Sequence, residues 1–148
     1  MSRSPDLAAA ARAYADFYEA LTPERLPELS ELCAPDVRFK DPFNEVRGVA
    51  ALTLVFAKMF EDVEAPRFRV DDIAIGAERA YLRWRFTFRR KGGGREAVID
   101  GMTEVGFDAQ GRVAEHIDHW DAASQLYERV PLLGSLIRLV KRRIAAAP

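Results

Sequence analysis

The chain has 148 residues, of which 49% are hydrophobic and 30% are charged, a balance that predicts one globular domain and excludes a disordered chain. The formal net charge of −1 provides no surplus of cations to neutralise phosphates, so we expect no nucleic-acid partner. Cys33 is the only cysteine, which excludes an internal disulfide and makes a cytoplasmic location the default expectation.

We expect no signal peptide at the N-terminus and no membrane span. Residues 1–11 are polar and then rich in alanine, without the apolar centre of a signal peptide. No apolar run approaches the length of a membrane span, so we expect none.

We expect Cys33 to be a small core residue and not a nucleophile.

Helical patterning occupies the first third of the chain. Asp6 is a plausible N-cap for a helix over 7–21, and Thr22 followed by Pro23 begins a second helix that should stop before Ala34. The first helix has apolar residues at the i, i+3, i+4, i+7 spacing of one buried face, namely Tyr14, Phe17, Tyr18 and Leu21.

A short strand is expected over 37–41, before a loop over 44–48. Because side chains alternate along a strand, Val37, Phe39 and Asp41 share one face. The pattern therefore places a carboxylate on the apolar side of this strand, at its end.

From residue 49 the pattern predicts one more helix, which carries Phe56 in its apolar stripe, and then a meander. The apolar spacing changes from a period of 3.6 to a period of 2, which is typical of antiparallel strands. The segments expected are a helix over 49–62, strands over 67–75, 80–89, 96–107 and 112–121, and a helical tail from residue 122. This order predicts an α+β fold in a single domain, 1–148, with 130–148 as a C-terminal helical extension.

The strand over 80–89 has the clearest alternation in the chain. Trp84 and Phe86 lie on its apolar face, whereas Tyr81, Arg83 and Arg85 lie on the other. The charged residues on that second face would suit a contact between two sheets. We therefore expect a homodimer.

The segment over 115–121, EHIDHWD, is the densest in groups that can do chemistry. On a strand, His116, Asp118 and Trp120 share one face, and His119 and Asp121 share the other. Parity alone does not say which face is inward. Asp121 is expected to cap the following helix, and His119 to lie at the surface or an interface.

Ligand types are present in this segment, but strand geometry argues against a metal site. Side chains on opposite faces cannot converge on one ion, although His116 and Asp118 could combine with Asp41 to make three ligands. We predict an acid/base set that needs no metal and no cofactor.

The tail is basic and amphipathic. Four cations lie near its C-terminal end, where they suit the helix dipole: Arg138, Lys141, Arg142 and Arg143. Such a helix could touch a membrane, but with so few cations we expect a lid over a pocket or a dimer contact.

Two segments resemble the NTF2-like superfamily, closest to its ketosteroid isomerase and SnoaL-like polyketide cyclase branches. They are FKDPFNEVRG over 39–48 and VGFDAQGRVAEHIDHWD over 105–121. The resemblance implies a cone, in which N-terminal helices pack against a strongly curved, mainly antiparallel sheet around a pocket. It also places His116, Asp118 and Trp120 inward, but the reaction stays open because this fold hosts many.

The resemblance assigns roles to particular residues. In ketosteroid isomerases the Asp of an x-Asp-Pro-Phe motif is the general base, and Asp41 falls on that position. Their oxyanion hole pairs a first-helix tyrosine, here Tyr18 or alternatively Tyr14, with a protonated aspartate, whose place Thr103 takes. A neutral hydroxyl donates less strongly, so steroid isomerisation by that mechanism is not supported.

A second branch implies a different base. Limonene-epoxide-hydrolase-like and SnoaL-like members use an acid or base on the last strand, at the position of Asp118. The Arg-x-Asp pair that the hydrolase also needs is missing from 81–83, so epoxide hydrolysis is not supported either.

Our leading hypothesis is an enzyme acting on an apolar, cyclic, carbonyl-bearing substrate. Asp41 or Asp118 moves a proton, and His116 relays or tunes it. Tyr18 and Thr103 donate hydrogen bonds to the substrate oxygen. The remaining substrate-binding residues, which line the pocket, are Tyr14, Phe56, Trp84, Phe86 and Trp120. The alternative is a non-catalytic module that binds a hydrophobic ligand or a partner chain. The missing oxyanion and Arg-x-Asp elements favour the module; ionisable groups in an apolar pocket favour the enzyme, because burying them is costly.

Overall fold

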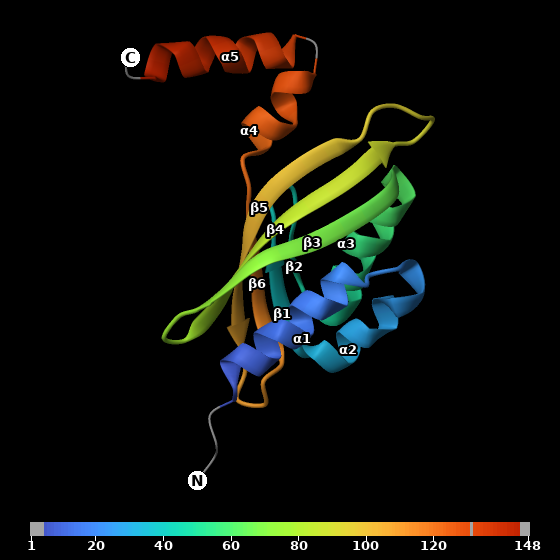
Figure 1. The fold of residues 1–148 in the computed structure, drawn as a ribbon, viewed down its shortest axis with the longest axis vertical. Helices are drawn as coiled ribbons and strands as arrows, with labels where there is room; N and C mark the ends of the chain where they lie inside the picture. Colours follow the sequence, from blue (N-terminus) through green and yellow to red (C-terminus); the bar gives the residue numbers. More distant parts are fainter. Residues whose placement is uncertain (1–4, 131, 146–148) are drawn as a thin grey trace.

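The computed structural model describes residues 5–130 and 132–145, and it has the predicted α+β architecture. Figure 1 shows a long, curved sheet with the N-terminal helices grouped along one side and a helical tail at one end. The helices and strands are α1 (Leu7–Glu19), η1 (Pro23–Glu28), α2 (Leu29–Leu32), β1 (Cys33–Lys40), β2 (Glu45–Arg47), α3 (Val49–Asp62), β3 (Val63–Ile75), β4 (Arg79–Arg90), β5 (Ala97–Phe107), β6 (Val113–His119), α4 (Ala122–Gln125), η2 (Tyr127–Arg129) and α5 (Leu133–Ile144).

The six strands form one sheet in the order β2-β1-β6-β5-β4-β3. All neighbours are antiparallel except β1 and β6, which run parallel. Cross-strand register places Thr103 of β5 opposite Asp118 of β6, and His116 opposite both Val105 and Phe39. The register thus gathers the polar residues of β5 and β6 at the middle of the sheet.

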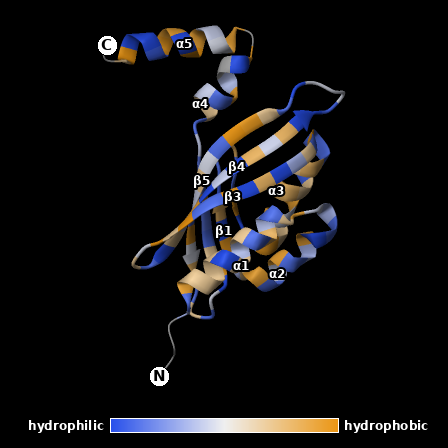
Figure 2. Ribbon diagram, in the orientation of Figure 1, coloured by the Kyte–Doolittle hydropathy of each residue, from blue (hydrophilic) through white to orange (hydrophobic). Residues whose placement is uncertain are grey.

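The first helix begins where the sequence predicts. Asp6 accepts a hydrogen bond from the backbone N–H of Ala9 at 3.1 Å, which satisfies one free donor of the first turn. The stripe that includes Tyr14, Phe17 and Tyr18 is buried, and α1 packs against β3 and β4. Figure 2 shows the alternation of apolar and polar residues along this helix.

Two local predictions are wrong in detail. The second helix is a 3-10 segment followed by a single α-helical turn, because Pro27 lies inside it and has no N–H to donate. Cys33 consequently opens β1 and is buried in the core, and the expected loop over 44–48 contains the short strand β2. The structure also ends β1 at Lys40, so Asp41 lies just beyond the strand.

One glycine in β5 permits an unusually close contact. A Cβ atom at Gly101 would lie 2.5 Å from two ring carbons of Trp84, which is opposite it on β4. Only glycine therefore lets the indole lie flat across β5. Trp84 is buried at this place.

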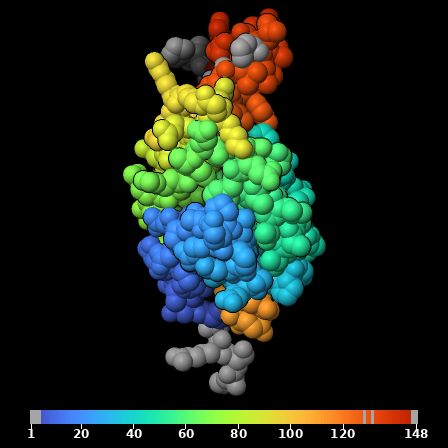
Figure 3. Space-filling view, turned by 90° about the vertical axis from the view of Figure 1, so that its right-hand side faces the viewer, coloured from blue at the N-terminus to red at the C-terminus, as the bar shows by residue number. Residues whose placement is uncertain are grey.

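The C-terminal helices extend the molecule at one end. Asp121 caps α4 as predicted, accepting a hydrogen bond from the N–H of Ser124 at 3.0 Å. Beyond it, η2 and α5 form a separate lobe above the sheet (Figure 3). Among the described residues, no helix has the length and apolarity required to cross a membrane.

Candidate functional site

A small apolar cavity lies between α1 and the concave face of the sheet. Ten side chains line it, from α1, α3 and strands β3 to β6: Tyr14, Tyr18, Phe56, Phe68, Val70, Leu82, Trp84, Thr103, His116 and Asp118. The space open to water is about 30 Å³, close to the volume of one water molecule. The cavity is therefore nearly filled by its own walls.

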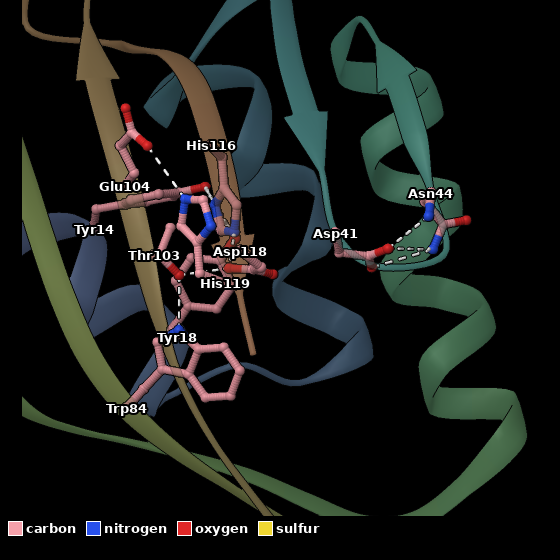
Figure 4. Close-up of polar contacts among 10 residues, drawn as sticks. All are labelled: Tyr14, Tyr18, Asp41, Asn44, Trp84, Thr103, Glu104, His116, Asp118 and His119. Atoms are coloured by element: carbon pink, nitrogen blue, oxygen red, sulfur yellow. Dashed lines mark hydrogen bonds and ion pairs between the residues drawn. The ribbon is translucent and has the colours of Figure 1, made fainter. Parts of the chain in front are cut away.

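His116 is at the centre of a hydrogen-bonded chain in this cavity. Its Nδ1 lies 2.8 Å from the hydroxyl of Tyr14 and 3.3 Å from that of Tyr18, and the two hydroxyls lie 2.9 Å apart. Its Nε2 lies 2.8 Å from Oδ1 of Asp118. Figure 4 shows the imidazole between the tyrosines of α1 and the carboxylate of β6. His116 is buried.

A second series of hydrogen bonds reaches the same carboxylate oxygen from Trp84 and Thr103. The indole N–H of Trp84 donates to Oγ1 of Thr103 at 2.7 Å, and the Thr103 hydroxyl donates to Oδ1 of Asp118 at 2.5 Å. Asp118 Oδ1 thus has two partners, Thr103 and His116. Both chains end at Asp118.

The network assigns the position of each proton. Because Asp118 Oδ1 is an acceptor, His116 carries its hydrogen on Nε2 and accepts at Nδ1. Tyr14, the nearer hydroxyl, donates to Nδ1, and Tyr18 donates to Tyr14. Each polar hydrogen of the five donors then has an acceptor inside the network. The described residues make no hydrogen bond to Asp118 Oδ2, so this oxygen is the acceptor left for a ligand.

Burial keeps the tyrosines in their neutral form. It raises the pKa of both Tyr14 and Tyr18 well above the usual value, since a phenolate has no water to solvate it there. Burial also raises the pKa of the Cys33 thiol to about 12. The two phenols are therefore hydrogen-bond donors at neutral pH, and Cys33 stays a thiol.

Most of the predicted site residues meet at this cavity. Seven of the ten line it: Tyr14, Tyr18, Phe56, Trp84, Thr103, His116 and Asp118. His116 and Asp118 lie on the inner face, as the family resemblance implies, whereas His119 is exposed and contacts Glu104 at 3.2 Å. Asp41, Phe86 and Trp120 are absent from the lining.

Asp41 caps a loop, which corrects the expected proton network with His116 and Asp118. Its Oδ1 accepts the backbone N–H groups of Phe43 at 2.7 Å and Asn44 at 2.6 Å, and the Asn44 amide also donates to it. Pro42 turns the chain here, and an aspartate at such a turn bonds the following backbone. Figure 4 shows the Asp41 side chain directed toward Asn44, away from His116.

Asp41 instead lines an open groove outside the cavity. The groove has a volume of about 500 Å³ and is formed by Lys40, Asp41, Pro42 and the residues 117–121. Asp118 is common to the groove and the cavity. Trp120 also lines the groove, and its ring packs edge-on against Phe43 at 5.6 Å. The carboxylate of Asp118 is therefore the link between the two spaces.

Two other predicted contacts differ from expectation. Phe86 stacks on Phe68 at 4.4 Å and on Phe88 at 5.1 Å, so it extends an aromatic row along the sheet outside the cavity. Thr103 uses its hydrogen on Asp118 and its oxygen on Trp84, so in this arrangement it has no hydrogen for a substrate oxygen.

Sequence reasoning missed three wall residues, Phe68, Val70 and Leu82. Phe68 and Val70 alternate with Arg67 and Arg69 in β3, and this alternation could have identified them. Within the described residues, no group of three or more His, Cys, Asp or Glu side chains is arranged to hold a metal ion.

Comparisons with known proteins agree with this fold. Residues 14–116, more than half of the chain, match the SnoaL-like domain. The chain belongs to the SnoaL-like domain family. This confirms the resemblance to the NTF2-like superfamily. No curated protein matches the chain.

Solved structures similar to this SnoaL-like protein carry several different descriptions. A candidate SnoaL-like polyketide cyclase from Jannaschia sp. CCS1 is 16% identical, with a TM-score of 0.69 over 100% of this chain and 99% of that one. An LEH-like epoxide hydrolase from M. tuberculosis is 19% identical, with a TM-score of 0.67 over 93% and 99%. A protein from Catenulispora acidiphila with a ketosteroid isomerase-like fold, in complex with trimethylamine, is 13% identical, with a TM-score of 0.66 over 84% and 92%. At such identities the likeness extends to the fold alone.

Proposed function

We propose that this protein is a small-molecule enzyme that works by general acid/base catalysis, with Asp118 as the base. The observation that carries the proposal is the asymmetry of its carboxylate. Oδ1 accepts hydrogen bonds from Thr103 and His116, whereas Oδ2 is unbonded among the described residues, and the Asp118 residue lines both cavity and groove. A fixed carboxylate with one open oxygen is suited to removing a proton from a bound molecule.

The proposed substrate class is an apolar, cyclic molecule that carries a carbonyl group. A pocket for such a ligand usually measures about 300 Å³ or more, which the cavity does not offer and the groove does. The ring system would lie against Trp120 in the groove, with only its reacting edge in the cavity. Trp84 and Phe56 would form the apolar wall on the inner side.

In the proposed reaction, Asp118 Oδ2 removes a proton from the carbon next to the carbonyl. The electron pair of that C–H bond moves to the carbonyl oxygen, which becomes an enolate, and Tyr18 turns its hydroxyl to donate to this oxygen. Tyr14 keeps its bond to His116 Nδ1, which holds the imidazole against Asp118. In a ketone with a β,γ double bond the enolate is conjugated with that double bond. Return of the proton from Asp118 to the γ-carbon then moves the double bond to the α,β position and completes an isomerisation.

Exchange of substrate hydrogen for deuterium tests the base directly. We would incubate a panel of cyclic ketones with the protein in D₂O and measure deuterium at the α-carbon by NMR. Asp118→Asn keeps the side-chain shape but replaces Oδ2 by an NH₂ group, and it should slow exchange by about 100-fold or more. The matched control, Asp62→Asn, alters an exposed carboxylate at the end of α3 that lines neither the cavity nor the groove, and it should keep exchange within a few-fold. Equal rates for Asp118→Asn and the unchanged protein would overturn the proposal.

A non-catalytic function is the competing proposal, and one observation favours it. The hydroxyl of Thr103, at the position where ketosteroid isomerases place a protonated aspartate, is already committed to Asp118. A module that only binds hydrophobic ligands would need no oxyanion donor. Members of the ketone panel would then bind and quench the fluorescence of Trp84. The protein would catalyse no exchange of hydrogen for deuterium in any of them.

We also propose a cytoplasmic homodimer that pairs through the outer face of the sheet. This face carries cross-strand ion pairs, such as Arg85 with Asp100 at 2.7 Å and Arg79 with Glu115 at 2.6 Å, around the exposed side chain of Met102. Light scattering of the unchanged protein and of Met102→Glu tests it, since the variant should be monomeric. The unbridged Cys33 thiol suits a reducing compartment.

A further inference from the structure

The helix α5 has a charge opposite to that of the rest of the protein. Residues 132–148 contain Arg138, Lys141, Arg142 and Arg143 and no acidic residue. The other 18 of the 22 Lys and Arg residues are therefore outnumbered by all 23 Asp and Glu residues. A positively charged helix is thus attached to a negatively charged domain.

The same helix exposes a continuous apolar stripe. Its members recur at the i, i+3, i+4, i+7, i+11 spacing that places them on one helix face: Leu133, Leu136, Ile137, Val140 and Ile144. The exposed fraction is 57% for Leu136 and 78% for Ile144, values that a core helix would not show. Lys141 and Arg143 border the stripe on its two sides, and Arg142 lies opposite it.

The position of α5 leaves the stripe accessible. Figure 1 shows the helix lying across one end of the molecule. It packs against η2, and none of its residues lines the cavity or the groove. The lid expected from the sequence is therefore not formed in this structure.

We propose that α5 binds the surface of a membrane that contains anionic phospholipids. A helix with an apolar stripe and flanking cations lies in the plane of such a surface, with the stripe in the acyl boundary and the cations at the head groups. Lys141 donates to Ser124 and Arg138 donates to Ser135, and the net positive charge of α5 attracts anionic lipid and complements the apolar burial. Because α5 lies across the end of the molecule, the acidic domain would extend away from the surface that repels it.

A second copy of the chain fits these observations less well. Two α5 helices paired through their stripes would bring together the bordering cations of both copies, Lys141 and Arg143, and α5 has no acidic residue to place between them. The domain of a second copy offers no matching apolar stripe among its described residues. Its large exposed apolar side chains are dispersed over a loop, α3, β3, β5 and the residue after η2, namely Phe43, Leu54, Ile75, Met102 and Val130.

Vesicle flotation of the full chain tests the proposal. The protein should float with vesicles of phosphatidylcholine mixed with phosphatidylglycerol, should bind pure phosphatidylcholine weakly, and should be released by salt. Arg143→Ser removes a cation that borders the stripe and should weaken binding to the anionic vesicles by about 5-fold, the effect of one cation at a membrane surface. Leu136→Glu with Val140→Glu should abolish binding to both kinds of vesicle.

Matched variants on the domain control for charge and for exposed apolar area. Arg89→Ser with Arg90→Ser removes two exposed cations from the end of β4, and Leu54→Glu changes an exposed leucine of α3; both should float like the unchanged protein. The proposal is overturned if the unchanged protein stays in solution, or if the α5 variants float as it does. It is also overturned if the protein ignores vesicles and Leu136→Glu converts a dimer to a monomer by light scattering, since α5 would then bind a second copy.

Discussion

Thr103 and Asp118 lie opposite each other on β5 and β6, and the Thr103 hydroxyl donates to Oδ1 of Asp118 at 2.5 Å. Asp118 lines both the cavity and the groove, and its other carboxylate oxygen makes no hydrogen bond to the described residues. The same hydroxyl accepts the indole hydrogen of Trp84, so one small side chain holds both an aromatic wall and the proposed base.

Replacing Thr103 by Val should destabilise the protein. The substitution keeps the shape but leaves the buried N–H of Trp84 without an acceptor and removes one of the two donors to Asp118, which should lower the free energy of unfolding by about 1–3 kcal/mol. Urea unfolding followed by circular dichroism measures it. Thr103→Ser retains the hydroxyl and should lose less than Thr103→Val; equal losses would show that the hydrogen bonds contribute little.

Substitutions of the two tyrosines of α1 should affect stability and activity in opposite order. Tyr14 makes the shorter bond to His116, so Tyr14→Phe should lower the free energy of unfolding by about 1 kcal/mol, more than Tyr18→Phe does. Tyr18 is the proposed donor to the substrate, so Tyr18→Phe should slow deuterium exchange more than Tyr14→Phe does. Parallel unfolding and exchange measurements on both variants test this reversal of order. The same order in both would contradict the assigned roles.

Gly101→Ala should displace Trp84. The added Cβ would lie 2.5 Å from the indole ring, so the ring must shift and lose its bond to Thr103. We expect a loss of about 1–3 kcal/mol of stability, together with a change in tryptophan fluorescence. Gly106→Ala on the same strand is the control, because its Cβ would meet its nearest neighbour at 3.4 Å. A Gly101→Ala protein as stable as the control would show that the indole can move freely.

Alkaline pH should destabilise the protein through Tyr14 and Tyr18. Burial raises the pKa of both, so above about pH 10 the unfolded chain releases these protons while the folded protein retains them. The free energy of unfolding should therefore fall as the pH rises beyond that value, by about 1.4 kcal/mol per pH unit for each group. Urea titrations between neutral and alkaline pH measure the slope. The double variant Tyr14→Phe/Tyr18→Phe should show a shallower fall, and an unchanged slope would contradict this origin.

Features that depend on near neighbours in the chain follow from the sequence alone. The caps at Asp6 and Asp121 join residues three positions apart, and α3 occupies 49–62 as its apolar spacing predicts. Alternation along β6 separated His116 and Asp118 from His119, because side chains on a strand point to opposite faces whatever lies beside it. The family resemblance then placed the first pair inward.

The tertiary structure decided which of these groups touch. The bond from Thr103 to Asp118 depends on the register of β5 against β6, and the contact of Tyr14 with His116 joins residues 102 positions apart. Asp41 has the same residue type as Asp118 and lines the same groove, but a turn at Pro42 directs it to Asn44. Local pattern gives the face on which a side chain lies, whereas its partner is set by strand pairing and helix packing, which depend on residues distant in the chain.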